Sequence, residues 1–125
     1  MKIKNYINGE FVNPILDNWI DNYNPSNGEI YSQIPNSSDI DLKNAFKAAK
    51  HAFPKWSETT LEKRSQILSN IAHLITKKLP ELAAAEAKDN GKPLELAKSI
   101  DIPRAAANFQ FFANAITQFA SETHD

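Results

Sequence analysis

Hydrophobic and polar residues alternate in short runs over the first 36 positions of the chain. The alternation predicts three extended segments, at residues 6–12, 19–23 and 29–34. Within the first, Asn8-Gly9 lies between apolar and aromatic residues, which predicts a hairpin with a type I′ turn. Between the second and third we expect a turn, because Pro25 fixes φ and either Gly28 or Asn27 can take positive φ. Pro35 is expected to close the last strand.

From residue 37 the period of the apolar positions changes to that of a helix. Ser38 is followed three residues later by Asp41, a spacing that resembles a capping box and predicts a helix start. One apolar stripe then follows at helical spacing: Leu42, Ala45, Phe46, Ala49, Ala52 and Phe53. We expect Pro54 to end this helix, because proline cannot donate the hydrogen bond that continues it.

A second helix is predicted after Thr59, which has Glu62 at the capping-box spacing. Its apolar stripe consists of Ile67, Leu68, Ile71, Leu74, Ile75 and Leu79. Pro80 suits the first turn of a third helix over 81–90, and Gly91 suits the position that follows a helix end.

The last part of the chain is predicted to hold a short turn over 94–99 and a final helix. Asp101 is a candidate N-cap for that helix, with Pro103 in its first turn. The apolar set of the helix is Ala105, Ala106, Phe109, Phe112, Ala113, Ile116 and Phe119, with Ala120 beside it. Phe109, Phe111 and Phe112 resemble a base-stacking cluster, but the helical spacing of Phe109 and Phe112 favours core packing.

Composition and charge exclude several classes of function. The net charge is −1, from 14 basic and 15 acidic residues, so electrostatics gives no case for nucleic acid or an anionic membrane as a partner. The start of the chain lacks the apolar core of a signal peptide, and we expect a cytoplasmic protein. The chain has no cysteine, which excludes disulfides and zinc sites that use cysteine.

Few residues support catalysis or ligand binding. His51, His73 and His124 have no metal-ligand spacing, and no serine lies in a nucleophile-elbow motif. Phosphate-binding loops need several glycines close together, whereas the three glycines here are far apart. We therefore predict no catalytic and no cofactor-binding residue in this chain.

Six short motifs, in order, resemble the opening segment of the aldehyde dehydrogenase family. They are residues 6–11 (YINGEF), 24–30 (NPSNGEI), 48–56 (AAKHAFPKW), 62–64 (EKR), 67–68 (IL) and 89–93 (DNGKP). The stretches 31–36 (YSQIPN), 101–104 (DIPR) and 108–113 (NFQFFA) further resemble the branch that oxidises muconic semialdehydes. The resemblance covers almost the whole chain.

The resemblance implies an α/β fold in which this chain is the N-terminal part of the NAD-binding domain. Residues 1–36 are expected to form its strand arm and 37–125 the helical part of the same, incomplete domain, with four to five helices and without the central parallel sheet. It also implies that the nucleophilic cysteine, the general base and the NAD loop lie beyond residue 125. NAD would serve the complete, homo-oligomeric enzyme, and this chain would not bind NAD tightly.

The resemblance suggests one site within the chain. Many members of the family hold a structural monovalent cation through a backbone carbonyl before the Asn-Pro turn and a carboxylate after the GKP motif. The matching positions are Tyr23 and Asp101. The alternative is that Asp101 only caps the last helix.

Three functions remain open from the sequence. The first is an N-terminal segment of an NAD-dependent aldehyde dehydrogenase, whose partner is the remainder of the enzyme. The second is a non-catalytic scaffold or subunit-interaction module that binds a full-length relative. The third is an independent helical binding domain with an accidental likeness to the family.

Overall fold

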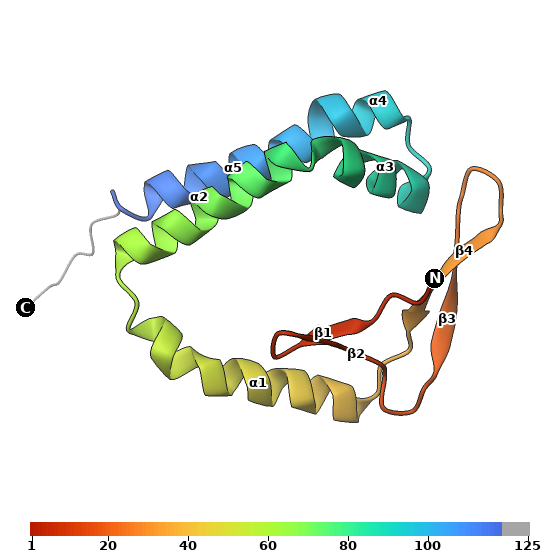
Figure 1. Cartoon of the computed structure of the whole chain (residues 1–125), viewed down its shortest axis with the longest axis horizontal. Helices are drawn as coiled ribbons and strands as arrows, with labels where there is room; N and C mark the ends of the chain where they lie inside the picture. Colours follow the sequence, from red (N-terminus) through yellow and green to blue (C-terminus); the bar gives the residue numbers. More distant parts are fainter. Residues whose placement is uncertain (119–125) are drawn as a thin grey trace, which may run out of the picture. The chain divides into compact units, whose positions relative to one another are not determined.

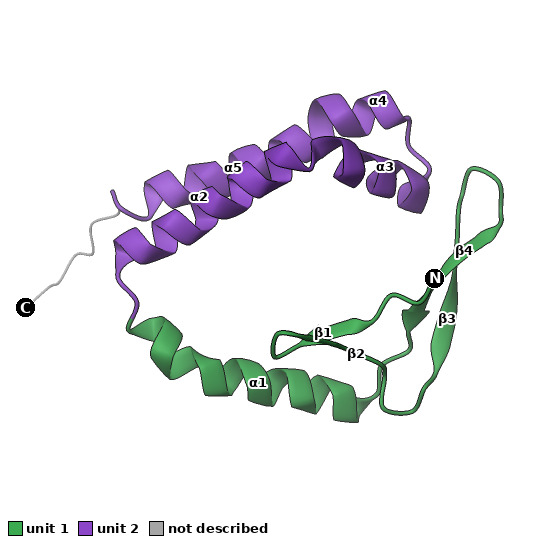
Figure 2. Ribbon diagram, in the orientation of Figure 1, with its two compact units in different colours: residues 1–58 green, residues 59–125 purple. Residues whose placement is uncertain are grey.

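The computed structural model describes residues 1–118 (Figure 1). The chain forms two compact units, Met1–Glu58 and Thr59–Asp125 (Figure 2). The first unit contains four strands and one long helix, and the described part of the second is entirely helical. The predicted small strand arm followed by helices is confirmed. The prediction that both segments belong to one incomplete domain stays a prediction.

The first unit contains two antiparallel pairs of strands. β1 (Asn5–Ile7) pairs with β2 (Glu10–Val12), and β3 (Trp19–Tyr23) pairs with β4 (Ile30–Pro35). The turn of the first pair confirms the type I′ expectation, because Asn8 has φ of 55° and Gly9 has φ of 85°. Across this pair the rings of Tyr6 and Phe11 lie 5.0 Å apart.

The second strand pair is extended by the start of the chain. Lys2 forms a parallel bridge with Gln33 of β4. The Ile3 N–H donates to the Gln33 carbonyl at 2.8 Å, and the Gln33 N–H donates to the Met1 carbonyl at 2.9 Å. The start of the chain is therefore joined to β4 by an isolated bridge, which the sequence pattern did not indicate.

α1 (Asp39–Ser57) begins at the predicted capping box of Ser38 and Asp41 but does not end where predicted. The helix continues through Pro54 for one further turn. Proline removes a single hydrogen bond and a helix end already lacks partners for its last groups, so the final turn of a long helix tolerates it. The expectation that Pro54 ends the helix is wrong.

The second unit is built on two long helices that lie side by side and antiparallel, α2 (Leu61–Lys77) and α5 (Ile102–Ala115) (Figure 1). The Ser65 hydroxyl donates to the Ala113 carbonyl at 2.7 Å, and Gln110 Nε2 donates to Ser69 Oγ at 3.2 Å. These two hydrogen bonds fix the register of the helices. The N-cap of α2 is Thr60, which accepts from the Lys63 N–H, and not the predicted Thr59.

Three shorter elements connect α2 to α5: α3 (Leu79–Asn90), α4 (Leu94–Leu96) and the π-helical turn η1 (Ala97–Asp101). The positions of Pro80 at the start of α3 and Gly91 at its end agree with the sequence prediction. The turn predicted at 94–99 is instead helical, and η1 leads directly into α5. Of the last apolar positions, Phe119 and Ala120 lie outside the described residues.

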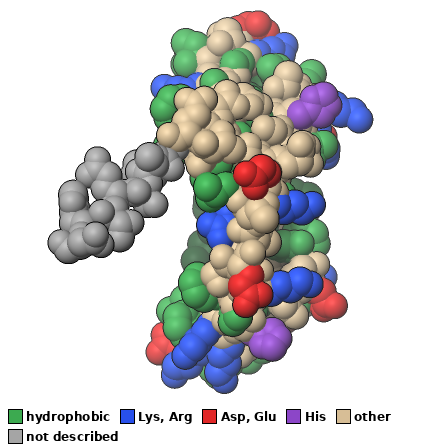
Figure 3. Space-filling view, turned by 90° about the vertical axis from the view of Figure 1, so that its left-hand side faces the viewer, with side chains coloured by type: hydrophobic (Ala, Val, Ile, Leu, Met, Phe, Trp, Pro, Cys, Tyr) green, Lys and Arg blue, Asp and Glu red, His purple; other side chains and the backbone are tan. Residues whose placement is uncertain are grey.

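The buried apolar residues are five alanines and one proline. They are Pro14, Ala72, Ala83, Ala97, Ala106 and Ala113 in the described part of the chain. Large apolar side chains stay at the surface, where Figure 3 shows many of them in green. Phe112 is 61% exposed and Phe46 is 64% exposed, so the predicted core packing of Phe112 is wrong for this chain. Alanine allows α2 and α5 to approach closely, which leaves no room for larger side chains between them.

Candidate functional site: the ion-pair cluster around Lys92

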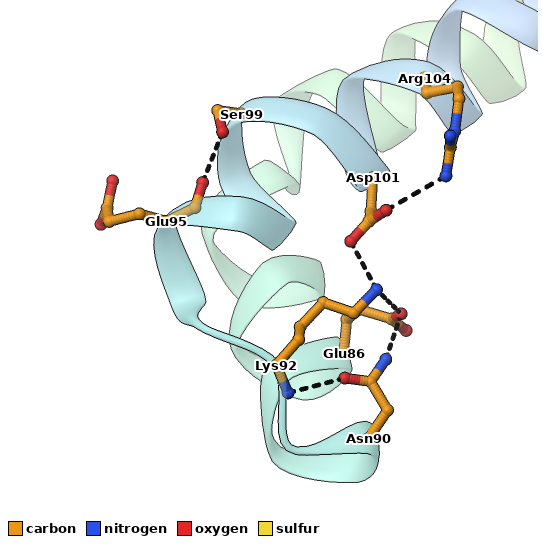
Figure 4. A network of polar contacts seen from close by, with 7 residues as sticks. All are labelled: Glu86, Asn90, Lys92, Glu95, Ser99, Asp101 and Arg104. Carbon is orange, nitrogen blue, oxygen red and sulfur yellow. Dashed lines mark hydrogen bonds and ion pairs between the residues drawn. The ribbon is translucent and has the colours of Figure 1, made fainter.

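The cluster around Lys92 depends on the way α3 ends. Gly91 adopts the left-handed conformation, with φ of 77°, and its N–H donates to the Ala87 carbonyl at 2.9 Å. The side chain of Asn90 then accepts from the Lys92 N–H at 3.0 Å. This helix end reverses the chain and fixes the backbone of Lys92 beside the last turn of α3 (Figure 4).

Two carboxylates bind the Lys92 ammonium. Nζ lies 2.5 Å from Asp101 Oδ2 and 2.9 Å from Glu86 Oε1 (Figure 4). The side chains of Lys92 and Asp101 are 25% and 18% exposed, so these ion pairs are better shielded from water than ordinary surface pairs. The cluster thereby joins α3 to the end of η1.

Asp101 also has a second cationic partner. Its Oδ1 atom lies 3.2 Å from the Arg104 guanidinium, while Glu86 accepts a further hydrogen bond from Asn90. The cluster therefore contains two anions and two cations, and its formal charges cancel. Both oxygens of Asp101 are engaged by cations of the chain itself.

Asp101 stands at the predicted N-cap position of α5, but its side chain does not cap the helix. Asp101 has helical angles, φ of −68° and ψ of −51°, and its side chain makes no cap hydrogen bond. The N–H of Ile102 already donates to the Ala97 carbonyl of η1. Because the π-helical turn supplies partners for the first N–H groups of α5, the helix has no free terminus there for a side chain to cap.

Hydrogen bonds and charge fix the protonation state of Lys92. The hydrogen bond to Asp101 raises the pKa of Lys92, and the hydrogen bond to Glu86 raises it further. Lys92 is therefore held as a cation at neutral pH and is not a nucleophile or a general base. The arrangement holds the Lys92 ammonium between α3 and the end of η1.

A second polar cluster lies at the start of α1. The buried carboxylate of Asp41 accepts from the Ile15 N–H at 2.9 Å, and from the N–H and hydroxyl of Ser38 at 2.8 Å each. Hydrogen bonds from Ser38 first, and then from Ile15, lower the pKa of Asp41. This carboxylate therefore fixes the loop before β3 to the first turn of α1.

The two residues of the predicted cation site lie in different units. Tyr23 ends β3 beside a β-bulge in the first unit, and Asp101 belongs to the Lys92 cluster in the second. The cation site stays a prediction. Within residues 1–118, no group of three or more His, Cys, Asp or Glu side chains is placed to hold a metal ion. His124 lies outside this range.

Sequence reasoning missed Glu86 and Lys92 as interacting residues. The signal was present in part, because Gly91 predicted the end of α3 and so a reversal of the chain. Helical spacing does not relate Lys92 to Glu86 or Asp101, since the partners lie on opposite sides of that reversal. Only the folded backbone brings them together.

A shallow groove lies between α2 and α5 in the second unit. Its volume is 410 Å³. It is lined by Ala72, His73, Thr76, Leu79, Ile102, Pro103, Ala106, Ala107 and Gln110. The lining is mostly apolar, and its polar side chains are those of His73, Thr76 and Gln110, without a carboxylate, so the groove favours packing over catalysis. None of the described helices is both long enough and apolar enough to cross a membrane.

Comparisons with known proteins agree on one family. The family model described as "Aldehyde dehydrogenase family" matches residues 11–125. The chain is 43% identical to the human (Homo sapiens) 2-aminomuconic semialdehyde dehydrogenase over 122 residues, which cover 98% of this chain and 25% of that protein. It is 32% identical to the Escherichia coli 5-carboxymethyl-2-hydroxymuconate semialdehyde dehydrogenase over 123 residues, 98% of this chain and 26% of that protein.

A solved structure matches the fold as well as the sequence. The NAD⁺ complex of an aldehyde dehydrogenase from Bacillus cereus superposes with a TM-score of 0.94 at 34% sequence identity. The match covers 99% of this chain and 26% of that one. The chain thus spans about a quarter of the length of the proteins that it matches.

Proposed function

Because the chain belongs to the aldehyde dehydrogenase family, we propose that it is the N-terminal segment of an NAD-dependent enzyme that oxidises an aldehyde to a carboxylic acid. A muconic semialdehyde is the proposed class of substrate. The observation that carries this proposal is the 43% identity to 2-aminomuconic semialdehyde dehydrogenase along nearly the whole chain. The bacterial relative named above is also a semialdehyde dehydrogenase.

The proposed role of this segment in the enzyme is structural. Among its described residues the buried apolar side chains are small, five alanines and Pro14, and it presents large apolar side chains on α1, α2 and α5. Exposed apolar surface of this extent is typical of a face that packs against further protein. We propose that the remainder of the enzyme covers these faces, and that the Lys92 cluster holds α3 against η1 beneath them.

The chain by itself is expected to be inactive. Aldehyde oxidation in this family begins with attack by a cysteine thiolate on the aldehyde carbon, and the chain has no cysteine. We also expect no tight binding of NAD. Its three glycines lie in separate turns and at a helix end, so none belongs to a loop that surrounds a pyrophosphate.

An alternative is a non-catalytic scaffold that binds a full-length relative. The exposed apolar faces of the helices favour it equally, because a second polypeptide can cover them as well as a continuation of the same one. For the complete enzyme we further propose a cytoplasmic location, homo-oligomeric assembly and a monovalent cation held by the Tyr23 carbonyl and Asp101. Family resemblance supports these three proposals.

The experiment compares residues 1–125 with the polypeptide encoded by the complete reading frame. Each is incubated with NAD, or with NADP, and a panel of muconic semialdehydes, betaine aldehyde and acetaldehyde, and NADH or NADPH absorbance is followed. We expect turnover by the complete polypeptide, fastest with the semialdehydes, and none by residues 1–125.

Two results contradict the proposal. Turnover by the cysteine-free chain would show that the assigned mechanism is wrong. A reading frame that encodes no cysteine, together with capture of the chain by a full-length relative in co-expression, would favour the scaffold instead.

A further inference from the structure

Each glycine of the chain follows an asparagine. The three dipeptides are Asn8-Gly9, Asn27-Gly28 and Asn90-Gly91. In an Asn-Gly sequence the glycine nitrogen is the least hindered of backbone nucleophiles, because glycine has no Cβ. The neighbouring side-chain amide is then open to intramolecular attack. The three dipeptides differ in the hydrogen bonds that their residues make.

Hydrogen bonds hold two of the three dipeptides in place. Asn27 donates to Glu29 Oε2 at 3.0 Å and accepts from the Glu29 N–H at 3.1 Å, while the Gly28 N–H donates to the Asn24 carbonyl at 2.8 Å. The Asn27 side-chain amide is therefore held by Glu29, and the Gly28 nitrogen already has an acceptor.

The Asn90-Gly91 dipeptide is held in the same way. Asn90 donates to Glu86 and accepts from the Lys92 N–H, and the Gly91 N–H donates to the Ala87 carbonyl. To react, this asparagine must leave both partners, and Gly91 must break the hydrogen bond that closes α3.

Asn8-Gly9 has no such restraint. Both residues are exposed, and within residues 1–118 neither the Asn8 side chain nor the Gly9 N–H has a hydrogen-bond partner. A Cβ built on Gly9 meets no atom within 4 Å, which is equally true at Gly28, so the two sites differ in their hydrogen bonds and not in the space at the glycine. The strands on either side are only three residues long, and such a short hairpin opens readily.

We propose that Asn8 is the site of spontaneous deamidation in this protein, and that the structure protects Asn27 and Asn90. The Gly9 nitrogen, after losing its proton to hydroxide, attacks Cγ of Asn8. A bond forms between that nitrogen and Cγ, and the bond between Cγ and Nδ2 breaks. The nitrogen Nδ2 takes up a proton and leaves as ammonia, which gives a five-membered succinimide.

Water then opens the succinimide. Addition at Cγ gives aspartate, and addition at the main-chain carbonyl carbon gives isoaspartate. The overall reaction consumes one water, releases one ammonia and involves no oxidation. Either product adds one negative charge, and isoaspartate also inserts a methylene into the backbone of the β1–β2 turn. That insertion disrupts the two-residue turn and the pairing of Tyr6 with Phe11.

The test follows loss of the side-chain amide during incubation of the polypeptide encoded by the complete reading frame in mildly alkaline buffer. Cleavage after glutamate at acidic pH, where succinimide formation is slow, places the three sites on separate peptides, 1–10, 11–29 and 87–95. Mass spectrometry with fragmentation measures the conversion of each asparagine. We expect Asn8 to convert severalfold faster than Asn27 and Asn90, with isoaspartate among the products.

Two controls separate structure from sequence. In concentrated guanidinium chloride the three rates should converge, because the hydrogen bonds that protect Asn27 and Asn90 are gone. The variant Asn8→Asp should abolish conversion in peptide 1–10, which shows that Asn5 on the same peptide does not contribute. Equal rates at the three sites in native buffer, or a faster Asn8 that persists in guanidinium chloride, would overturn the proposal.

Discussion

Asp39 and Asp41 occupy the same turn of α1 but have different roles. Both carboxylates are favourable near the positive end of the helix. Asp41 is buried and accepts hydrogen bonds from the Ile15 and Ser38 N–H groups, whereas Asp39 is exposed. An asparagine at either position keeps the size of the side chain and removes its charge. A comparison of Asp41→Asn with Asp39→Asn therefore separates the contribution of the hydrogen bonds from the effect of charge alone.

We predict that Asp41→Asn speeds hydrogen exchange at the Ile15 and Ser38 amides, whereas Asp39→Asn leaves it nearly unchanged. The pKa of Asp41 is lowered in the folded chain, so its stabilising contribution is complete above the ordinary value of 3.8. The contribution is lost as pH falls through the lower, folded pKa. Exchange measured at neutral pH and below pH 3.8 should therefore differ in the natural chain more than in Asp41→Asn.

Lys92 gives a second prediction at the scale of the residue. Lys92→Met keeps the length of the side chain but leaves the Glu86 and Asp101 carboxylates without their shared cation. We expect the helical signal in far-ultraviolet circular dichroism to melt at a clearly lower temperature. Lys98→Met is the matched control, because its pair with Glu95 is exposed, and such pairs contribute about 0–1 kcal/mol.

The contribution of Lys92 to stability should decrease at strongly alkaline pH. Its pKa is raised in the folded chain, so its contribution is complete below the ordinary value of 10.5 and is lost as pH rises through the folded value. The difference in melting between the natural chain and Lys92→Met should shrink at strongly alkaline pH. A difference that grows there would show that the ion pairs are not the cause.

Single-residue roles were the hardest part to predict from the sequence. The Ser38–Asp41 pair was found because both partners lie within one helical turn, where spacing determines contact. The contact of Asp41 with Ile15 and the pairing of Lys92 with Asp101 cross between elements. Sequence spacing carries no information on such contacts, and in the case of Asp101 it favoured a cap that the π-helical turn makes unnecessary.

At the scale of the element, Gly91 determines where α3 ends. Gly91→Ala places a Cβ on a residue with φ of 77°, a conformation that costs an ordinary L-residue about 1–2 kcal/mol. We expect Gly91→Ala to lower the thermal stability of the helices by about that free energy, and Gly91→Asn to cost less, because asparagine tolerates this conformation. Equal losses for the two variants would contradict this explanation.

The existence and order of the elements followed from the period of apolar residues. Strands at 19–23 and near 29–34, and helices over most of 39–115, agree with the expected segments. The errors lie at ends and junctions. Pro54 is accommodated because its helix ends one turn later, and Thr60 serves as cap although Thr59 has the better spacing to an acidic residue. At such positions two neighbouring residues satisfy the same local rule, and tertiary contacts decide between them.

At the scale of the whole molecule, the chain has little buried apolar surface to stabilise it. Fully burying a large apolar side chain contributes about 1.5–3 kcal/mol, while the net stability of a domain is only about 5–15 kcal/mol. Leu74 and Phe112 remain 52% and 61% exposed on the two longest helices of the second unit. A few such positions without cover are enough to remove most of that margin.

We therefore predict that residues 1–125 alone associate or lack a fixed tertiary structure. Near-ultraviolet circular dichroism, which reports on Trp19 and Trp56, should show no sharp thermal transition, and sedimentation should show species larger than a monomer. A monomer that melts cooperatively above about 60 °C would show that the chain is a self-sufficient domain.

The alanine contacts have a consequence for natural variation. Where α2 meets α5, Ala113 is fully buried against Ser65, so a larger residue there must push two helices apart, whereas Ala72 and Ala106 also border the groove. Leu74 and Phe112 are mostly exposed, so packing within this chain does not limit their size. Among relatives, the small residues should therefore vary independently of the rest of the enzyme. The large ones should change together with whatever residues cover them, and such paired changes would identify those residues from sequences alone.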